Sequence, residues 1–464
     1  MAKLKLRGKE LIRLGFSEGP IVGQLIDLAK KHLKHEGKEA VLELFSQLRE
    51  QPEDFLSHPF LADAAHILQP IEKTDEFSLR KDKQEYPIYG PEGIDEGAIG
   101  QMDVAMQLPV AVGGALMPDA HYGYGLPIGG VLATENAVIP YGVGVDIGCR
   151  MALSIYEMAP TYIEENGKQL KSFLNEHSRF GRAGFDRPMD DPVLDRPEFH
   201  SIPMLKGLKD KARKQIGSSG SGNHFVEFGV VTVTDLDNEF DLPPGKYLGL
   251  LTHSGSRGLG AQIARHYTKL AMEKCPLPKI AQHLAWLDLD TEEGMEYWLA
   301  MNLAGDYASA NHRHIHLRMT RALGSEPLAC IENHHNFAWK EQLADGRNCI
   351  VHRKGATPAQ EGVLGIIPGS MSATGYIVRG RGHTDALNSA SHGAGRQLSR
   401  TKARNSITRK EFKKYLRDHN VDLIGGGLDE APMAYKDINE VMRHQGQLVD
   451  IVGSFRPRIV RMDS

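Results

Sequence analysis

Five short stretches of the sequence carry polar side chains that an ordinary hydrophobic core would not use. Each lies at the end of an apolar run or in a glycine-rich loop, which is where binding and catalytic residues are commonly found. The stretches are VGVDIGC with Asp146 and Cys149, GSGNHFVEFG with His224, LTHSGSRGLG with His253, ENHHN with His334 and His335, and SHGAGR with His392.

Together these stretches offer oxygen, sulfur and nitrogen ligands. Such a mixed set suits a first-row divalent ion such as manganese, zinc, cobalt or iron better than magnesium or calcium alone. The set contains more ligands than one tetrahedral site needs, which would allow two metals that share a bridging ligand. Paired metals favour displacement chemistry at phosphorus.

Each of these residues also has a simpler interpretation when taken singly. A histidine after an apolar strand is more often a hydrogen-bonded core residue than a ligand. Cys149 is more often a small buried hydrophobe, and Asp146 could stabilise its own turn. The case for a site therefore depends on their joint occurrence.

His392 lies among residues with almost no side chain, in NSASHGAGRQLSR. From the residues alone it could be a packed core histidine, a metal ligand, or a group that something large must reach. The glycine-rich stretches HRKGATPAQEG and IIPGSMSATGY offer unobstructed backbone N–H groups of the kind that bind phosphates. Basic clusters at 206–214 and 396–404 fit either local anion binding or a solvated helix face.

The elements that must position these residues change in character along the chain. Residues 1–80 show apolar residues at helical spacing, which predicts a helical N-terminal module. From residue 85 short strand-like runs alternate with glycine turns. The pattern predicts one long helix over 293–323, a proline-rich surface excursion over 185–215, and a helix that Thr408 and Glu411 begin as a capping box.

The predicted fold class is therefore α+β, a mixed α/β catalytic body over residues 85–464 with a small helical N-terminal extension. Strands and helices do not alternate regularly enough for a doubly wound sheet.

Composition narrows the class of protein further. The net charge of −4 gives no global signature of nucleic-acid binding, so any such site must be a local patch. The sequence has no run of eighteen apolar residues and no apolar segment of the secretory type near its start. Four scattered cysteines form no CxxC pair, and a reducing cytoplasm is the expected location.

Nine motifs, in order, resemble those of the RtcB family of RNA-splicing ligases: MPDAHYGYGLPIGG, VGVDIGC, GNHFVEFG, HSGSRGLG, HHN, HRKGAT, IPGSM, SHGAGR and AYKDI. The resemblance runs from about residue 85 to the C-terminus. It implies a fold with β-sheets around a metal cleft. It also implies a GTP- and Mn²⁺-dependent ligase that joins an RNA 2′,3′-cyclic phosphate or 3′-phosphate end to a 5′-hydroxyl end, in tRNA splicing or RNA repair.

In this family a histidine attacks GTP and becomes guanylylated. The guanylyl group passes to the RNA 3′-phosphate, and the 5′-hydroxyl then displaces GMP. Carried over to this chain, the nucleophile is His392. Two Mn²⁺ ions are implied, with Cys149 as the shared thiolate. Their ligands are Asp146, Cys149, His224, His253 and His335.

The resemblance also implies a set of nucleotide contacts and two RNA contacts, Arg257 and Arg400. The nucleotide contacts are Asn223, His224, Glu227, Asn336, Pro368, Gly369, Ser370, Met371, His392, Gly393, Ala394, Gly395 and Tyr435. Met462 and Gly375 stand where the family usually has a lysine and a serine.

Two related activities remain open from the sequence. One is an RNA 3′-end processing enzyme that hydrolyses cyclic phosphates or guanylylates ends without sealing them, and the other is a non-catalytic RNA-binding paralogue. The resemblance also allows an archease-type activating partner. The N-terminal segment is similar to a helical part of CCA-adding tRNA nucleotidyltransferases, so it is either an RNA-contacting module or a packing cap.

Overall fold

The computed structural model describes residues 6–16, 20–68, 77–234 and 238–464. The chain divides into two compact units, Met1–Asp75 and Glu76–Ser464. The helices of the first unit, α1 (Gly8–Arg13), α2 (Pro20–His32), α3 (Lys38–Glu50) and α4 (Ala62–Leu68), enclose their own core. Leu11, Leu25 and Phe45 are fully buried there, because apolar residues recur on one face of each helix.

The large unit is built on an eight-stranded sheet in its described part. The order is β12-β13-β16-β5-β6-β4-β8, every neighbouring pair is antiparallel, and β15 adds to β16 in parallel. The strands are β4 (Arg150–Tyr156), β5 (Phe225–Val233), β6 (Gly245–Ser254), β8 (Ala329–His334), β12 (Leu364–Ile367), β13 (Gly375–Gly380), β15 (Asp422–Ile424) and β16 (Val449–Met462).

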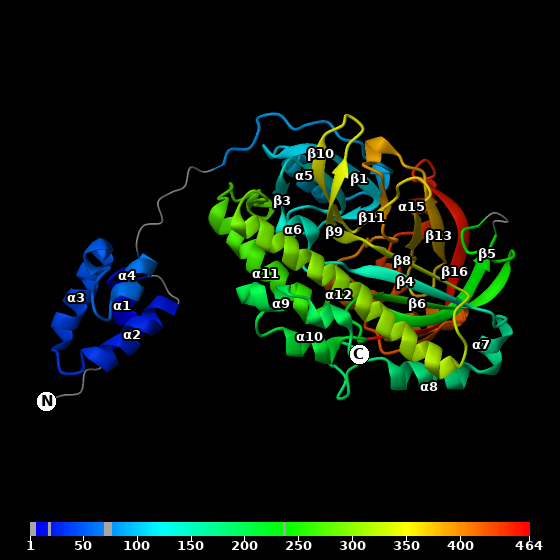
Figure 1. The fold of residues 1–464 in the computed structure, drawn as a ribbon, viewed down its shortest axis with the longest axis horizontal. Coiled ribbons are helices and arrows are strands. Elements are labelled where there is room, and N and C mark those ends of the chain that lie inside the picture. The colour runs from blue at the N-terminus through cyan, green and yellow to red at the C-terminus, as the bar shows by residue number, and fades with distance from the viewer. Residues whose placement is uncertain (1–5, 17–19, 69–76, 235–237) are drawn as a thin grey trace. The chain divides into compact units, whose positions relative to one another are not determined.

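The two ends of this sheet approach each other, so that it forms a nearly closed barrel (Figure 1). The Ile366 N–H of β12 donates to the Asn333 side chain of β8 over 2.9 Å. The predicted α+β class is confirmed, and the antiparallel pairing explains why the strand and helix pattern did not alternate as in a doubly wound fold.

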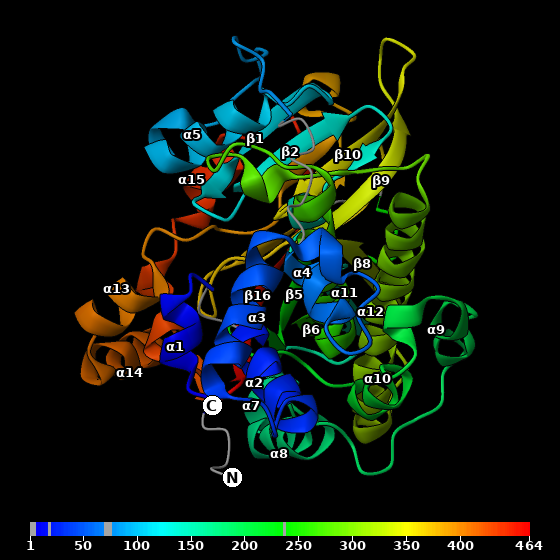
Figure 2. The same ribbon diagram turned by 90° about the vertical axis from the view of Figure 1, so that its left-hand side faces the viewer.

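A second sheet has the order β1-β2-β10-β9, and its strands lie side by side in Figure 2. Two further pairs, β11 with β14 and β3 with β7, are short. The strands are β1 (Ala111–His121), β2 (Ile128–Thr134), β3 (Ala137–Val138), β7 (Leu287–Asp288), β9 (Asn336–Gln342), β10 (Asn348–Lys354), β11 (Ala356–Pro358) and β14 (Ser389–Ser391). Two of these strands position a candidate functional residue: β1 of the second sheet contains Asp119, and β14 of the short pair with β11 ends immediately before His392.

The long helix predicted over 293–323 is confirmed as α12, Glu292–Leu323. Its residues Ile315 and Met319 pack on the outer face of the large sheet, against Leu248 and Leu250 (Figure 1). The apolar residues that recur at helical spacing along this segment lie on its inner side. They are buried except for Trp298, which is half-buried: Met301, Ala304, Tyr307, Ala308, Ile315, Met319 and Leu323.

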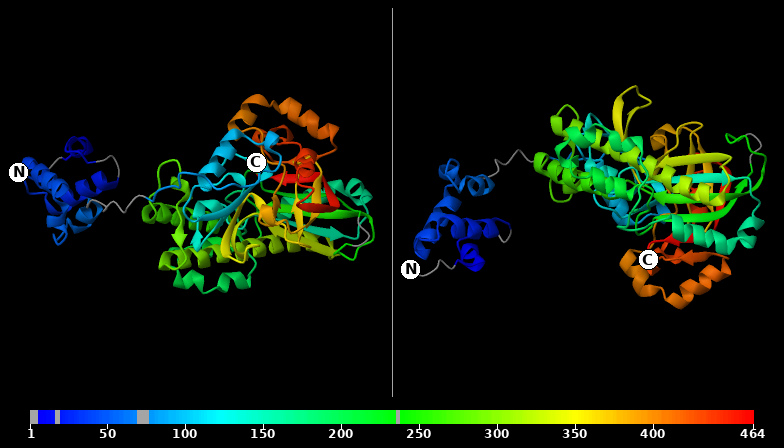
Figure 3. Two further views of the ribbon diagram at one scale, coloured as in Figure 1. Left: turned by 90° about the horizontal axis from the view of Figure 1, so that it is seen from above. Right: turned by 60° about the horizontal axis from the view of Figure 1, so that its bottom comes forward.

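The other helices of the large unit cover the two sheets. They are α5 (Glu96–Ala105), α6 (Pro140–Val143), α7 (Thr161–Glu165), α8 (Gly167–His177), α9 (Glu198–Ser201), α10 (Lys209–Gln215), α11 (Arg257–Lys274), α13 (Arg400–Ser406), α14 (Arg409–Asp418) and α15 (Ile438–Arg443). The predicted capping box of Thr408 and Glu411 is confirmed at the start of α14. Helices α13 and α14 form an orange pair beside the C-terminal strand (Figure 3).

The segment 185–215 is not the surface excursion that its prolines and charges predict. It folds into short helical turns that include α9 and α10, and Val193, Phe199 and Leu205 are buried in the largest core cluster. Its prolines begin these turns, because a fixed φ suits the first helical position. The apolar residues between them supply the buried face. No helix in the described ranges has the length and apolar character needed to cross a membrane.

Candidate active site

Four ligand-type side chains meet because four adjacent strands of the large sheet share one end. His224 precedes β5, His253 lies near the end of β6, Cys149 precedes β4, and His335 follows β8. Antiparallel neighbours alternate in direction, so the start of one strand lies beside the end of the next. His253 accordingly pairs with Phe225 on one side and Met151 on the other.

The turn that holds Asp146 and Cys149 fits closely against the long helix. Gly148 has a φ of +69°, and a Cβ added there would lie 2.9 Å from the backbone of Gly305 in α12. The Cys149 N–H donates to the Asp146 carbonyl over 3.1 Å, and the Gly148 N–H donates to the Asn336 carbonyl over 2.7 Å. Glycine is needed at position 148, because its φ is positive and a side chain there would meet the α12 backbone and push the turn away from the other ligands.

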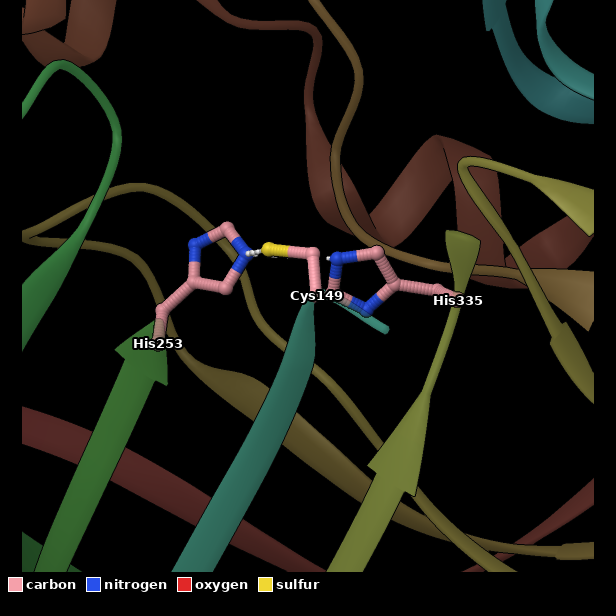
Figure 4. A group of neighbouring side chains, drawn as sticks. All are labelled: Cys149, His253 and His335. Carbon is pink, nitrogen blue, oxygen red and sulfur yellow. Dashed lines mark hydrogen bonds between the residues drawn. The ribbon is translucent and has the colours of Figure 1, made fainter. Parts of the chain in front are cut away.

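The donor atoms form two groups that share the Cys149 sulfur. Its Sγ lies 3.2 Å from His253 Nε2 and 3.4 Å from His224 Nε2. His253 Nε2 lies 3.2 Å from His335 Nε2, and His224 Nε2 lies 2.9 Å from an Asp146 oxygen. Figure 4 shows the Cys149 sulfur between the rings of His253 and His335.

These distances fit metal coordination. Ligand atoms held about 2.0–2.3 Å from one tetrahedral ion stand roughly 3.3–3.7 Å apart, close to the observed separations. The Nδ1–H of His253 donates to the Asn223 carbonyl over 3.0 Å, which leaves the Nε2 lone pair directed at the cluster. Two triads that share one sulfur match the donor set of a two-metal centre.

The electrostatics of the cluster also favour a cation. Burial lowers the pKa of His253 to about 3 and that of His335 well below its usual value, so both rings are neutral and their lone pairs face each other. Burial and the charge of Asp146 raise the pKa of the Cys149 thiol. Burial alone would raise the pKa of Asp146, but hydrogen bonding to His224 holds it below the usual range. A divalent cation would relieve the repulsion between the lone pairs and favour the thiolate.

His392 is held by a buried carboxylate that the sequence prediction did not include. Its Nδ1–H donates to Asp119 over 2.7 Å, and the same oxygen accepts the backbone N–H groups of His392 and Gly393 over 3.1 and 3.3 Å. Burial opposes ionisation of Asp119, but the His392 charge and hydrogen bond keep its pKa low. In the neutral ring this hydrogen bond places the proton on Nδ1 and the lone pair on Nε2, which has no hydrogen-bond partner in the described chain.

His392 opens onto a cavity of about 270 Å³, whose wall also contains His253 and His335. The ring centroids of His335 and His392 are 5.0 Å apart, so His392 lies beside the cluster. Most of the predicted nucleotide contacts line this cavity. They are Asn223, Pro368, Gly369, Ser370, Met371, His392, Gly393, Ala394, Gly395 and Tyr435.

The other three predicted nucleotide contacts lie elsewhere. Glu227 lines a small adjoining cavity with Phe225 and the Pro368–Met371 turn, and its Oε2 is buried without a hydrogen-bond partner in the described structure. His224 is part of the metal cluster. Asn336 supports the backbone, because its Oδ1 accepts the Gly355 N–H over 2.8 Å.

The two predicted RNA contacts differ in their surroundings. Arg257 is half-buried, with its Nε donating to Ser218 Oγ over 3.2 Å. Arg400 lines the cavity and forms ion pairs of 3.1 and 2.9 Å with Asp429 and Glu430.

Sequence reasoning missed Asp119, His121 and the pair Arg396–Glu430 as parts of the site. Asp119 left a signal, because it is a lone carboxylate in an otherwise apolar run, VAVGGALMPDAH, within one of the nine motifs. His121 lies in the same motif, two residues after Asp119, whereas Glu430 left no signal that distinguishes it from other glutamates. Their place in the cavity wall depends on how distant segments fold together.

Comparison with known proteins gives a consistent result. The chain matches the family described as "tRNA-splicing ligase RtcB" over residues 101–200 and 195–463. It is 32% identical to the RNA-splicing ligase RtcB of Escherichia coli K12 over 376 residues, which covers 74% of this chain and 88% of the relative. It is 31% identical over 433 residues to the tRNA-splicing ligase RtcB of Nanoarchaeum equitans, covering 78% and 91%, and 33% identical over 399 residues to that of Methanococcus maripaludis, covering 70% and 82%.

The shared sulfur leads to a prediction about metal stoichiometry. We expect the wild-type chain to bind two Mn²⁺ ions and Cys149→Ala to lose at least one, with at least tenfold weaker binding of the other, because both donor groups use Sγ. Elemental analysis after dialysis and titration calorimetry would measure this. Cys349→Ala, at a buried cysteine of β10 outside the cluster, is the matched control. Unchanged two-ion binding by Cys149→Ala would rule out a shared thiolate.

Proposed function

Because the chain belongs to the RtcB family, we propose that it is an RNA ligase that joins 2′,3′-cyclic phosphate or 3′-phosphate ends to 5′-hydroxyl ends with GTP and Mn²⁺. The family match confirms the resemblance of the nine motifs. The observation that carries the chemical proposal is the position of His392, which stands beside two donor groups that share Cys149 and has its Nδ1 held by Asp119.

His392 acts as the nucleophile in this proposal. Its Nε2 lone pair forms a bond to the α-phosphorus of GTP while the bond to the bridging oxygen breaks and pyrophosphate leaves. Asp119 keeps the proton on Nδ1 and stabilises the positive charge that develops on the ring, as the carboxylate of a catalytic triad does. The guanylyl group then passes to the RNA 3′-phosphate, and attack by the 5′-hydroxyl displaces GMP.

Asp146, Cys149, His224, His253 and His335 would hold two Mn²⁺ ions. When bound, the ions polarise phosphate oxygens and offset the charge that develops during displacement. The Pro368–Met371 and His392–Gly395 loops line the same cavity as His253 and His335 and present small residues there. They leave room for a nucleotide to lie against His392 and bond to backbone N–H groups.

Glu227 supports a preference for guanine. Burial raises the pKa of its carboxyl well above the usual value, and Oε2 has no partner in the described structure. Two N–H donors on a base edge would stabilise the ionised carboxylate and so offset the cost of its burial. Guanine presents two adjacent N–H groups on its Watson–Crick edge, whereas adenine places an acceptor at N1. Met462 lines the main cavity and Gly375 the smaller one, so neither supplies a side-chain polar contact to the base.

We further infer that Arg257 and Arg400 meet RNA phosphates, that an archease-type partner can activate the chain, and that it works in the cytoplasm. The four cysteines are all unpaired, which suits a reducing compartment.

The joining reaction is tested with Mn²⁺, GTP and a cleaved tRNA that carries a cyclic-phosphate end. We expect a joined product from the wild type and none from His392→Ala, together with loss of covalent nucleotide labelling but unchanged Mn²⁺ binding. Release of guanylylated but unjoined RNA by the wild type would favour the end-processing alternative. Labelling that survives in His392→Ala would refute the assignment of the nucleophile.

Asp119→Asn should lower the rate of His392 labelling by roughly 10²–10⁴-fold, because an amide oriented to donate would favour the tautomer with its proton on Nε2. Mn²⁺ stoichiometry should stay unchanged. Nitrogen NMR of labelled histidine reports the tautomer directly, which a purely structural role of Asp119 would not alter. An unshifted tautomer with normal labelling would contradict the positioning role.

Glu227→Gln should weaken labelling by GTP by roughly 10–100-fold relative to the wild type, because one acceptor oxygen is replaced by a donor. The ratio of GTP to ATP labelling, measured with radioactive nucleotides, should fall with it. Equal labelling of the wild type by GTP and ATP would overturn the guanine preference.

A further inference from the structure

Five arginines around the loop 178–185 form no ion pair with a carboxylate in the described structure, although the chain as a whole has a net charge of −4. They come from the loop 178–185, from α12 and from β16, and are Arg179, Arg182, Arg318, Arg321 and Arg461. We call them the arginine cluster. Arg313, one turn earlier on α12, shows the contrast, because it pairs with Asp191 over 2.7 Å. Unpaired arginines side by side repel one another, and a bound anion would remove that cost.

The loop that carries part of the cluster is firmly held. The Ser219 N–H donates to the Arg179 carbonyl over 2.7 Å, and the Phe185 N–H donates to the Lys214 carbonyl over 2.9 Å. An Arg257 Nη2–H donates to the Gly181 carbonyl. The guanidinium groups are thus presented from a fixed backbone, which lowers the entropy lost on binding.

Phe185 fixes two of these guanidinium groups. The Arg318 Cζ lies 3.8 Å from the centre of its ring and the Arg179 Cζ lies 5.2 Å from it. Both distances fall within the range of cation–π contact. The Nε and one Nη of Arg318 are buried without a hydrogen-bond partner in the described chain. Burial and the nearby charges of Arg179 and Arg321 lower the pKa of Arg318, so no neighbouring group of opposite charge stabilises it.

The cluster is continuous with the metal site but separate from the nucleotide cavity. Arg257, which contacts the loop at Gly181, is attracted by the charge of Asp146. On β16, successive side chains point to opposite faces. Met462 accordingly lines the nucleotide cavity, whereas Arg461 stands 5.4 Å from the ring of Phe180 in the same loop. Arg257 therefore links the metal cluster, through the charge of Asp146, to the loop that carries part of the arginine cluster.

We propose that the arginine cluster binds the phosphodiester backbone of the substrate RNA a few nucleotides from the end that is joined. The proposal rests on the proposed function, because it takes RNA as the substrate. Successive phosphates match several guanidinium groups spread over one loop and two neighbouring elements. The nucleoside triphosphate of the proposed reaction would occupy a different site, the cavity on the other face of β16.

The test compares Arg179→Gln/Arg318→Gln with Arg347→Gln. Arg347 is half-exposed and paired with Asp345 on a distant hairpin, so its replacement changes net charge without touching the cluster. The probe is a fluorescent RNA stem-loop that ends in a single-stranded 3′-phosphate, with affinity measured by anisotropy at several salt concentrations. We expect the double variant to bind RNA at least tenfold more weakly. The slope of its log affinity against log salt concentration should fall by the amount that corresponds to about one to two phosphate contacts.

Two single variants guard against misfolding. Arg182→Gln alters an exposed side chain and should weaken binding about threefold, while Phe185→Leu keeps an apolar group but loses the cation–π contacts. Guanylylation of His392 needs no RNA and shows that each variant is folded. RNA affinity and salt dependence equal to those of Arg347→Gln would overturn the proposal. A wild type that binds RNA through the cluster but is never labelled would instead refute the proposed ligase chemistry.

Discussion

The buried sulfur of Cys149 is the atom on which the rest of the site depends. It lies within 3.2–3.4 Å of two imidazole nitrogens, with a carboxylate nearby, and its surroundings oppose its ionisation. A thiolate in such a place needs a cation, and the neutral imidazoles around it have lone pairs that face one another. The fold accepts this unfavourable local arrangement because strand pairing and a close helix contact fix the ligands in place. Gly148 is the clearest instance, because a Cβ there would lie 2.9 Å from the Gly305 backbone of α12.

His392 belongs to a different part of the architecture. The metal-type ligands come from the large sheet, whereas His392 follows a short strand and its partner Asp119 comes from the second sheet. The site thus lies between the large sheet, which contributes the metal-type ligands, and the strands β1 and β14, which position His392, the nucleophile of the proposed reaction. This division suits a reaction in which the nucleophile must be reached by a nucleotide and then by RNA. It leaves the small residues 393–395 as the wall against which a ligand can lie.

The arginines on the two faces of β16 differ in whether they have an acidic partner. On the nucleotide side, arginines are neutralised, because Arg396 and Arg400 pair with the buried Glu430 and its neighbour Asp429. On the opposite face of β16, the arginines around Phe180 and Phe185 form no ion pair with a carboxylate in the described chain, although Asp463 lies beside Gly181 of the same loop. The overall net charge of −4 conceals this contrast completely. Electrostatic steering of a polyanion depends on such local fields rather than on net charge.

The sequence by itself determined the ligand types, the long helix and the capping box, because these depend on residue chemistry and on periodicities within a short segment. It also indicated the α+β class through the change from helical spacing to glycine-bounded strands. It could not show that Asp119 holds His392 from 273 positions away along the chain, or that Asn336 serves the backbone rather than the cavity. Nor could it show that the apolar residues of 185–215 are buried. Those outcomes were decided by the tertiary structure, because a hydrogen bond or a cavity wall depends on distances between segments that no local pattern specifies.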